Sequence, residues 1–350
     1  MSTVVRSIDV GFGQVKYVAR VVSGDIECAH FSSVALPSLM DTGTRSALGG
    51  RRRTTSVRVG ELFYEVGHDI ELAGAQSRPA LSIDHYVEAP EYTALMRAAL
   101  HYMQLDSIDV LVVGLPVSVY RQRKSQLERL ATGVHDVGKG RTVTVKRALV
   151  VAQPQGALVT YAVQHDSLNA IQRQESLIID AGTRTLDWLT ARGLRLVSNR
   201  SHSAPYGVYN ITTAITEAIS DELKESFEDR DAIDLALRKI KPLSLYGKQY
   251  PIERYRPIVD SITQEAVRAM SLSIGGKYRF DNVVLVGGGA HLFKRALKEA
   301  FPKQRLQEVA EPIYANVRGY QRAGMDRVKA GSHGDAEAPE GVSGERNEAI

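Results

Sequence analysis

Residues 8–16 carry the sequence IDVGFGQVK, and residues 179–187 carry the sequence IDAGTRTLD. In both stretches an apolar strand ends in an aspartate, a glycine-containing turn follows, and a second strand returns. Such turns aim consecutive backbone N–H groups into a concavity that suits phosphate oxygens, and glycine lets a ligand approach the backbone closely. One turn of this type is ordinary Asp-X-Gly chemistry. Two in one chain predict a pair of hairpins that grip a polyphosphate from both sides.

Each hairpin has an aspartate at its mouth, Asp9 in the first and Asp180 in the second. A divalent cation that bridges phosphates is normally bound by one or two carboxylates, often through water. Asp9 and Asp180 are therefore the predicted catalytic carboxylates and Mg²⁺ ligands, either directly or through water. The expected phosphate contacts come from Gly11, Phe12, Gly13, Gln14, Lys16, Ala181, Gly182, Thr183, Arg184 and Thr185. Arg184 either contacts a phosphate or points to solvent, and Asp187 is expected to brace the second turn.

A third glycine-containing stretch follows the apolar strand predicted at residues 282–286. Gly287, Gly288 and Gly289 come directly after this strand and open a predicted helix. The amino-terminal end of a helix is positive, and a surface without side chains lets a nucleotide lie against the backbone. Three successive glycines cost about 0.5–1 kcal/mol each in conformational freedom, which packing alone does not explain. These glycines are therefore predicted to contact a nucleotide.

The length of 350 residues and the alternation of strand and helix patterns favour two α/β domains. Strands are predicted at residues 4–10, 15–22, 26–36, 110–114, 142–151, 177–180, 185–190, 194–199 and 282–286, with a hairpin at 57–67. Helices are predicted at residues 90–104, 120–131, 208–227, 256–273, 287–299 and 315–330, and another opens after 153–156. Residues 331–350 are rich in Gly, Glu, Ser and Pro, which predicts a disordered tail.

The composition excludes several classes of protein. An apolar fraction of 43% and a charged fraction of 24% are typical of a globular protein, and no apolar run approaches the ~18 residues of a membrane span. A cytoplasmic protein without membrane contact is expected. Cys28 is the only cysteine, so neither an intramolecular disulfide nor a cysteine-cluster metal site can form. The net charge of +4 does not favour sequence-specific nucleic-acid binding, and the basic run Arg51–Arg53 is expected to be a solvated loop rather than a polyanion contact.

The order and spacing of these motifs resemble the superfamily of actin, sugar kinases and DnaK-type chaperones. Its five motifs have counterparts here: residues 9–16 are similar to phosphate 1, 153–157 to connect 1, 180–187 to phosphate 2, 287–289 with Phe293 to the adenosine motif, and 315–320 to connect 2. Within the superfamily, residues 114–117, 180–188 and 315–319 are similar to the plasmid-partition ParM/StbA branch and the ParM-like protein of the PRTRC plasmid system. Phe12 departs from the pattern, because actin and ParM place a hydroxyl residue there.

This resemblance implies an α/β fold with two actin-like (ribonuclease H-like) domains and a nucleotide cleft between them. Residues 1–157 and 319–330 would form domain I, with an insertion at about 30–90. Residues 158–318 would form domain II, with an insertion at about 221–255. Gln155 would position the attacking water, as the connect 1 Gln or Glu does in this superfamily. A neutral amide orients water without removing its proton, so hydrolysis would be slow.

The function implied by the resemblance is an ATPase that binds ATP or GTP with Mg²⁺ and assembles into filaments, with a plasmid-encoded adaptor protein that links the filament to DNA. A second hypothesis is a nucleotide-switched regulatory module that does not polymerise. A third is a sugar-kinase-type phosphotransferase, which would need a carboxylate base in the cleft. No Asp or Glu stands at a comparably marked position of the sequence.

Overall fold

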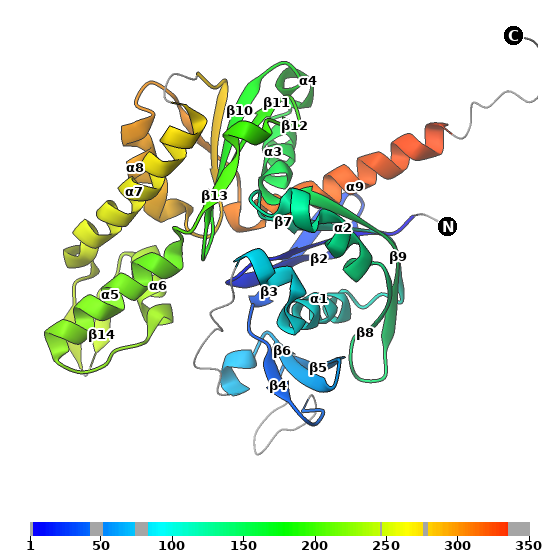
Figure 1. Ribbon diagram of the computed structural model, residues 1–350, viewed down its shortest axis with the longest axis horizontal. Helices are drawn as coiled ribbons and strands as arrows, with labels where there is room; N and C mark the ends of the chain where they lie inside the picture. The colour runs from blue at the N-terminus through cyan, green and yellow to red at the C-terminus, as the bar shows by residue number, and fades with distance from the viewer. Residues whose placement is uncertain (1–2, 43–51, 74–82, 246, 276–278, 335–350) are drawn as a thin grey trace, which may run out of the picture.

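The computed structural model describes residues 3–42, 52–73, 83–245, 247–275 and 279–334. They form two lobes, each built on its own six-stranded sheet (Figure 1). The predicted two-domain α/β architecture is therefore present. The tail prediction lies mostly outside the described residues, and its first part is wrong, because the last helix continues to Gly334.

The first sheet has the strand order β3-β2-β1-β7-β9-β8. Its strands are β1 (Val5–Val10), β2 (Gln14–Val22), β3 (Asp25–Ser32), β7 (Ser107–Leu115), β8 (Gly133–Asp136) and β9 (Thr142–Ala152). β1, β7 and β9 run parallel, whereas β2 and β3 return as an antiparallel meander. Parallel strands are buried on both faces, which explains the continuous apolar run in β7.

The second sheet repeats this layout with the order β12-β11-β10-β16-β17, and β13 pairs with β11. Its strands are β10 (Glu175–Ala181), β11 (Leu186–Arg192), β12 (Arg195–Leu196), β13 (His202–Ala204), β16 (Asn282–Val286) and β17 (Leu306–Glu308). β10, β16 and β17 are parallel, and β10 forms an antiparallel hairpin with β11. The first two strands of each sheet, β1–β2 and β10–β11, are thus the two hairpins recognised in the sequence.

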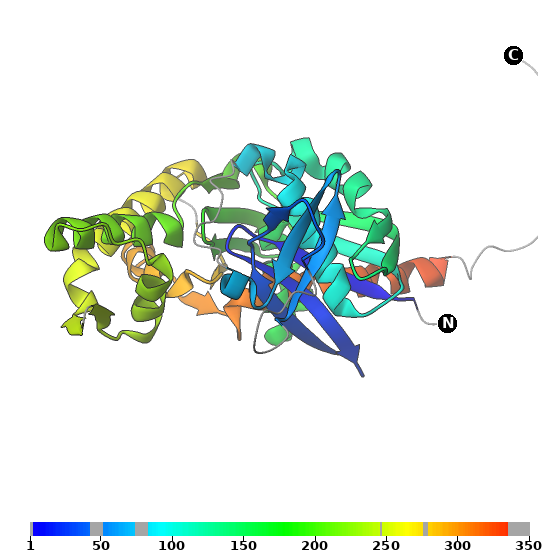
Figure 2. The ribbon, with the colours of Figure 1, turned by 90° about the horizontal axis from the view of Figure 1, so that it is seen from below.

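Smaller elements extend each lobe. The first lobe adds a three-stranded sheet of β4 (Leu36–Ser38), β6 (Leu62–Gly67) and β5 (Thr54–Val59), with 3₁₀ turns η1 (Ile70–Ala73) and η2 (Ile83–Glu88). The second lobe adds the hairpin of β14 (Leu243–Leu245) and β15 (Lys248–Tyr250), with 3₁₀ turns η3 (Ser198–Arg200), η4 (Ile252–Tyr255) and η5 (Pro312–Tyr314). Seen from below, the β4–β6 sheet of the first lobe lies far from α5 and α6 of the second (Figure 2).

Helices cover both sheets. They are α1 (Pro90–Met103), α2 (Tyr120–Ala131), α3 (Gln153–Gln164), α4 (Leu168–Ile171), α5 (Val208–Leu223), α6 (Arg230–Lys239), α7 (Arg256–Ile274), α8 (Ala290–Ala300) and α9 (Ala315–Gly334). The apolar face predicted for α1 is buried in the first-lobe core, and α5, α7 and α8 bury their apolar faces in the second-lobe core. Each lobe therefore has its own hydrophobic core.

α3 and α9 connect the lobes and cross each other between them (Figure 1). α3 contributes to the core beside the second sheet, whereas Tyr320 of α9 packs against the first. At the crossing the backbones touch, because a Cβ atom added to Gly319 would lie 1.8 Å from the Gly156 carbonyl oxygen. Only glycine permits so close an approach. The backbones of α3 and α9 are therefore in direct contact where these two helices cross between the lobes.

Several predicted boundaries are wrong. The strand predicted at 26–36 is interrupted, because β3 ends at Ser32 and Leu36 begins β4 in another sheet. The helix predicted at 208–227 ends at Leu223, where Lys224 takes a left-handed backbone with φ 58°. The strand predicted at 194–199 shrinks to the two residues of β12. The three glycines form the predicted turn into a helix, which begins at Ala290, whereas α6, β8, β13 and β17 were not predicted.

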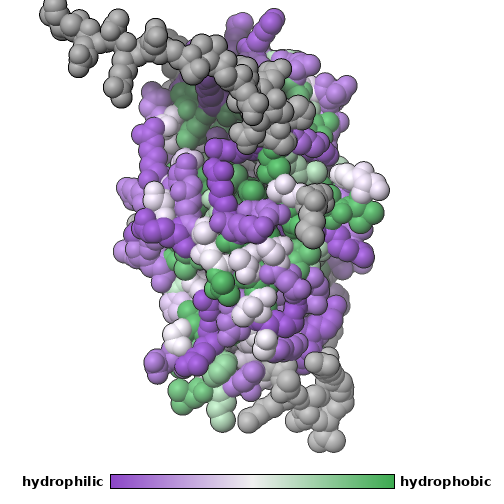
Figure 3. All heavy atoms as spheres, turned by 90° about the vertical axis from the view of Figure 1, so that its right-hand side faces the viewer, coloured by the Kyte–Doolittle hydropathy of each residue, from purple (hydrophilic) through white to green (hydrophobic). Residues whose placement is uncertain are grey.

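The structure also bears on the predictions made from composition. No helix in the described ranges combines the length and apolar character needed to cross a membrane. Hydrophilic side chains cover most of the face seen in Figure 3. Cys28 is half-buried in β3, and burial raises the pKa of its thiol to about 11. Arg52 and Arg53 form ion pairs with Glu65 and Asp69, whereas Arg51 lies outside the described residues.

Candidate functional site

The two hairpin turns have the same backbone geometry. The Gly11 N–H donates to the Gln14 carbonyl at 3.2 Å, and the Gly182 N–H donates to the Thr185 carbonyl at 2.9 Å. In register, Asp9 pairs with Lys16 across the first hairpin and Asp180 pairs with Asp187 across the second. Each aspartate therefore takes the same position, one residue before the end of its strand.

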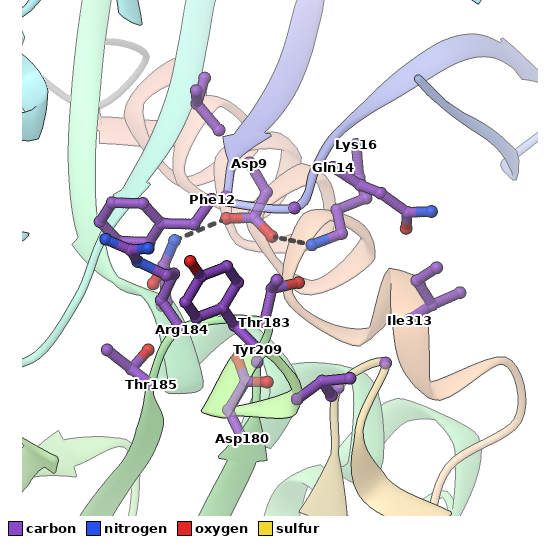
Figure 4. A pocket seen from close by; sticks show the side chains of 18 of the residues that line it. Asp9, Phe12, Gln14, Lys16, Asp180, Thr183, Arg184, Thr185, Tyr209 and Ile313 are labelled. Atoms are coloured by element: carbon purple, nitrogen blue, oxygen red, sulfur yellow. Dashed lines mark hydrogen bonds and ion pairs between the residues drawn. The ribbon is translucent and has the colours of Figure 1, made fainter. Parts of the chain in front are cut away.

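The turns approach each other from opposite domains. A Cβ atom added to Gly13 would lie 2.0 Å from Thr183 Oγ1, so the first turn touches the second. Figure 4 shows Asp9 and Asp180 on opposite sides of the space beside this contact. The structure thus brings together, across two domains, carboxylates that are 171 residues apart in the chain.

A cavity of about 920 Å³ lies along this contact and is called the inter-domain cleft below. Of the predicted site residues, its lining contains Asp9, Gly11, Phe12, Gly13, Gln14, Lys16, Asp180, Gly182, Thr183, Arg184, Thr185, Gly287 and Gly288. The volume is at the upper end of the ~300–1,000 Å³ typical of sites for small ligands and cofactors. The cleft is therefore large enough for a nucleotide.

Asp9 lies at the centre of a polar network in the first domain. Its carboxylate is 3% exposed, lies 3.6 Å from Lys16 Nζ, and accepts a hydrogen bond of 2.8 Å from Gln153 Nε2. Figure 4 marks both contacts with dashed lines. A nearly buried carboxylate with one ammonium and one amide donor retains free lone pairs for a cation or its water ligands.

Asp180 lies at the floor of the cleft on the second domain. Burial and then the neighbouring Asp187 carboxylate raise the pKa of its carboxyl to about 7, against the opposing effect of a hydrogen bond from Asn316. Asn316 Nδ2 donates to Asp180 Oδ2 at 2.6 Å. Asp187 itself accepts hydrogen bonds from Thr185 and Ser203, in keeping with the expected bracing of the second turn. A bound cation would favour the ionised form of Asp180.

Gln155 does not lie where the sequence placed it. Its Oε1 accepts a hydrogen bond of 3.1 Å from the Ala152 N–H, so the side chain caps the start of α3, and it is not part of the cleft lining. Gln153, two residues earlier, lines the cleft and reaches Asp9. Gln or Glu at the third position of a helix is a capping residue, a signal that could have excluded Gln155.

The three glycines after β16 have different surroundings. Gly287 has φ +93°, and a Cβ atom there would lie 2.3 Å from Asp180 Oδ1. The Gly289 N–H donates to the Ala181 carbonyl at 2.8 Å, and neither Gly289 nor Ala181 lines the cleft. A Cβ atom on Gly288 would meet only the Arg238 guanidinium, at 3.7 Å. Gly288 alone therefore presents open backbone to a ligand. Phe293, assigned to the same motif, is fully buried in the second-lobe core.

Phe12 and Arg184 meet across the cleft. The Arg184 guanidinium lies 5.8 Å from the ring centre of Phe12 and 4.9 Å from that of Tyr209. Phe12 also stacks on Tyr86, with ring centres 4.3 Å apart. Arg184 therefore lies over aromatic rings of both domains and lines the cleft, and its expected contact with a phosphate stays a prediction. The place of the usual hydroxyl is taken by a cation–π contact.

Sequence reasoning missed the outer end of the cleft. Val208, Tyr209 and Thr212 of α5, Asp234 and Arg238 of α6, and Pro312, Ile313 and Asn316 line it. Arg238 donates to the Gly288 carbonyl at 2.7 Å and pairs with Asp234 at 2.9 Å. Only Asn316 lies in a motif that the sequence had singled out. The others come from helices whose approach depends on the tertiary fold.

The lining fits a nucleotide with a hydrated cation. Three of its buried side-chain oxygens, Tyr92 Oη, Asn316 Oδ1 and Asp234 Oδ1, have no hydrogen-bond partner, although buried polar atoms are nearly always paired. The part of the chain that the structure describes has no group of three or more His, Cys, Asp or Glu side chains able to bind a metal. Two carboxylates together with phosphates and water are the usual arrangement for Mg²⁺.

Comparison with known proteins supports this reading of the fold. Residues 7–156 match the family model described as the N-terminal domain of actin-like proteins, and residues 178–299 match that of the archaeal actin homologue MreB-like C-terminal domain. No match was found among curated proteins.

Solved structures cover the whole fold. The archaeal actin homologue Ta0583 has a TM-score of 0.73 at 21% identity, and its complex with ADP has 0.71 at 22%. A ParM from Clostridium botulinum, solved as a 15-stranded filament, has 0.72 at 18%. Each alignment covers 93% of this chain and 100% of the other. The predicted fold class, two actin-like domains around a cleft, is thereby confirmed.

Proposed function

We propose that this chain, an actin-like protein in both of its domains, binds a nucleoside triphosphate with Mg²⁺ in the inter-domain cleft and hydrolyses it slowly. One observation carries the proposal: two turns with the same backbone hydrogen bond, one from each domain, meet at the cleft and present Asp9 and Asp180 from opposite sides. The nucleotide complex of a structural relative supports it, because Ta0583 was solved with ADP.

The phosphates would lie in the cleft beside the contact between the two turns, against Phe12 and Gly13 of the first turn and Thr183 of the second. Asp9 and Asp180 would hold the hydrated Mg²⁺, and Lys16 adds positive charge beside them. The cation neutralises charge on the transferred phosphoryl group when it is bound. The base would lie at the outer end, against Gly288 and the side chains of α5 and α6. This arrangement leaves ATP and GTP as alternatives.

Gln153 takes over the catalytic role that the sequence assigned to Gln155. The Asp9 carboxylate can only accept hydrogen bonds, so it fixes the amide with Nε2 toward Asp9 and leaves Oε1 to accept a hydrogen from water. A neutral amide orients the water and does not take its proton, which keeps the reaction slow. A sugar-kinase-type phosphotransferase would use a carboxylate base in the cleft, whereas the group proposed here to contact the water is an amide.

Filament assembly is the second part of the proposal. One ParM structure with the same fold is a filament, and a second structure is that of a non-polymerisable quadruple mutant of a ParM. Self-association of this chain in the triphosphate state, plasmid segregation and a plasmid-encoded adaptor are proposed by this analogy. The non-polymerising switch remains the alternative, since it would use the same cleft.

Gln153→Ala and Gln155→Ala form the matched pair that tests this function. Gln153→Ala should lower the single-turnover hydrolysis rate by about a hundredfold, with unchanged nucleotide affinity, because only water positioning is lost. Gln155→Ala should hydrolyse normally and lose stability by roughly 1 kcal/mol, because a helix cap is removed.

Sedimentation of the same samples with Mg²⁺ and ATP or GTP tests assembly. In the filament model the wild type pellets with nucleotide, and Gln153→Ala pellets for longer because the triphosphate is not consumed. Soluble protein under every condition would favour the switch. Normal hydrolysis by Gln153→Ala would remove this residue from the mechanism.

A further inference from the structure

Tyr92 is a buried residue in the lining of the inter-domain cleft. It belongs to the first turn of α1, is 1% exposed, and lines the cleft together with Tyr86, Leu115 and Gln153. The function proposed above assigns it no role. Its ring explains its burial, because Tyr92 belongs to the apolar face of α1 that packs in the first-lobe core.

The hydroxyl of Tyr92 has no hydrogen-bond partner, although it is shielded from solvent. Its two tyrosine neighbours differ in this respect. The Tyr86 hydroxyl donates to the Gly11 carbonyl at 3.2 Å, and the Tyr320 hydroxyl donates to the Gln153 carbonyl at 3.4 Å. Buried tyrosine hydroxyls usually find a partner, since an unpaired one loses its water contacts without replacement. The partner of Tyr92 is therefore expected among the contents of the loaded cleft.

The surroundings of this hydroxyl place it beside the reacting end of the site. Burial raises the pKa of Tyr92, and Tyr86 and the Asp9 carboxylate raise it further, so the phenol stays protonated at neutral pH. Tyr92 in turn contributes to the raised pKa of Tyr320, whose hydroxyl contacts Gln153. Tyr92 and Gln153 thus flank the same carboxylate, Asp9, from two different helices.

We propose that Tyr92 is a second residue that positions the attacking water, together with Gln153. This inference rests on the proposed hydrolysis. The Tyr92 hydroxyl would donate its hydrogen to the water oxygen, and the water would donate one hydrogen to Gln153 Oε1. Its second lone pair is then directed at the phosphorus, and its second hydrogen passes to a phosphate oxygen as the bond to the leaving group breaks. Two fixed contacts define the orientation of a water molecule far better than one, and such positioning is much of what a protein contributes to phosphoryl transfer.

Tyr92→Phe tests the proposal because it removes only the hydroxyl. Single-turnover hydrolysis should slow on the order of tenfold or more, while the affinities for ADP and for a non-hydrolysable triphosphate stay unchanged. Affinity for ADP with aluminium fluoride, which mimics the transferred phosphoryl group, should fall. The melting temperature should stay equal or rise, since the variant no longer buries an unpaired polar group.

Tyr161→Phe is the matched control. The Tyr161 hydroxyl is buried away from the cleft and hydrogen-bonds Asn282 at 3.0 Å, as well as Gln307. Its loss should lower the melting temperature and leave hydrolysis unchanged. The change in melting temperature therefore differs between Tyr92→Phe and Tyr161→Phe. This difference distinguishes a hydroxyl that contacts a ligand from one that stabilises the fold.

Wild-type hydrolysis by Tyr92→Phe would overturn the proposal for Tyr92 and leave the proposed function intact. A lower melting temperature with weaker ADP binding would also overturn it, because the hydroxyl would then be structural. A wild-type chain that binds nucleotide without hydrolysing it would refute the proposed function, and the role of Tyr92 with it.

Discussion

Asp180 is the residue whose charge depends most on what the cleft contains. Its carboxyl is surrounded by protein and faces the Asp187 carboxylate, and together these raise its pKa from 3.8 to about 7. In the empty protein the proton therefore competes with the cation near neutral pH. Asn316 donates to one carboxylate oxygen and opposes the shift. The site is thus suited to take up a cation together with the loss of a proton.

This shift predicts a pH-dependent stability. The folded protein binds a proton at Asp180 that the unfolded chain releases, so this contribution to the free energy of unfolding falls as pH rises from about 4 to 7. Asp180→Asn carries no charge and should lose the dependence. In EDTA the variant should gain stability relative to the wild type over this range, on the order of 3 kcal/mol at neutral pH. Thermal melts from about pH 5 to 8 measure the difference, and a constant difference would contradict the assigned shift.

At the scale of elements, the two hairpins are joined by the contact between Phe12 and Arg184. Gly13 and Thr183 bring the turns together, and the guanidinium of the second turn lies over the ring of the first. Tyr86 also stacks on Phe12, and its hydroxyl donates to the Gly11 carbonyl, which fixes the Tyr86 ring. The contact therefore links the two domains beside the proposed phosphate site.

Phe12→Leu and Arg184→Ala should each speed nucleotide dissociation several-fold, because a cation–π contact of about 0.5–2 kcal/mol no longer closes the cleft. The double variant should be no faster than the faster single variant, since both changes remove one contact. Stopped-flow release of a fluorescent nucleotide measures this, with the exposed Arg195→Ala as control. Additive effects would mean that Arg184 acts independently of Phe12, as a phosphate ligand would.

Some elements of the fold and the site could be predicted from the sequence, and others could not. The hairpins, the buried parallel strands and the glycines after β16 could be predicted, because apolar runs, Asp-Gly turns and glycine carry local signals. Gln153 could not be told from Gln155 by motif, since the direction of each side chain depends on how α3 leaves β9. Tyr92 and the lining residues of α6 lie far in sequence from both hairpins. They reach the cleft only through tertiary packing, which no periodicity or motif in the sequence indicates.

At the scale of the molecule, two lobes with separate cores meet at the cleft and at the crossing of α3 and α9. Gly156 and Gly319 allow backbone contact at the crossing, next to Gln153 at the start of α3. A change in the angle between the lobes would therefore move Gln153 relative to Asp180. The crossing can thus couple the ligand bound in the cleft to the angle between the lobes. That angle determines the surface to which a second copy of the chain would bind.

Single-turnover release of phosphate from Mg²⁺-ATP and Mg²⁺-GTP by the wild type and by Asp180→Ala tests the central claim most directly. Asp25→Ala, an exposed carboxylate of β3, is the control. We predict slow, EDTA-sensitive hydrolysis by the wild type and the control, and loss of nearly all hydrolysis in a folded Asp180→Ala protein, because one of the two cation ligands is missing. Equal phosphate release by Asp180→Ala and wild type, or none by the wild type, would contradict the account.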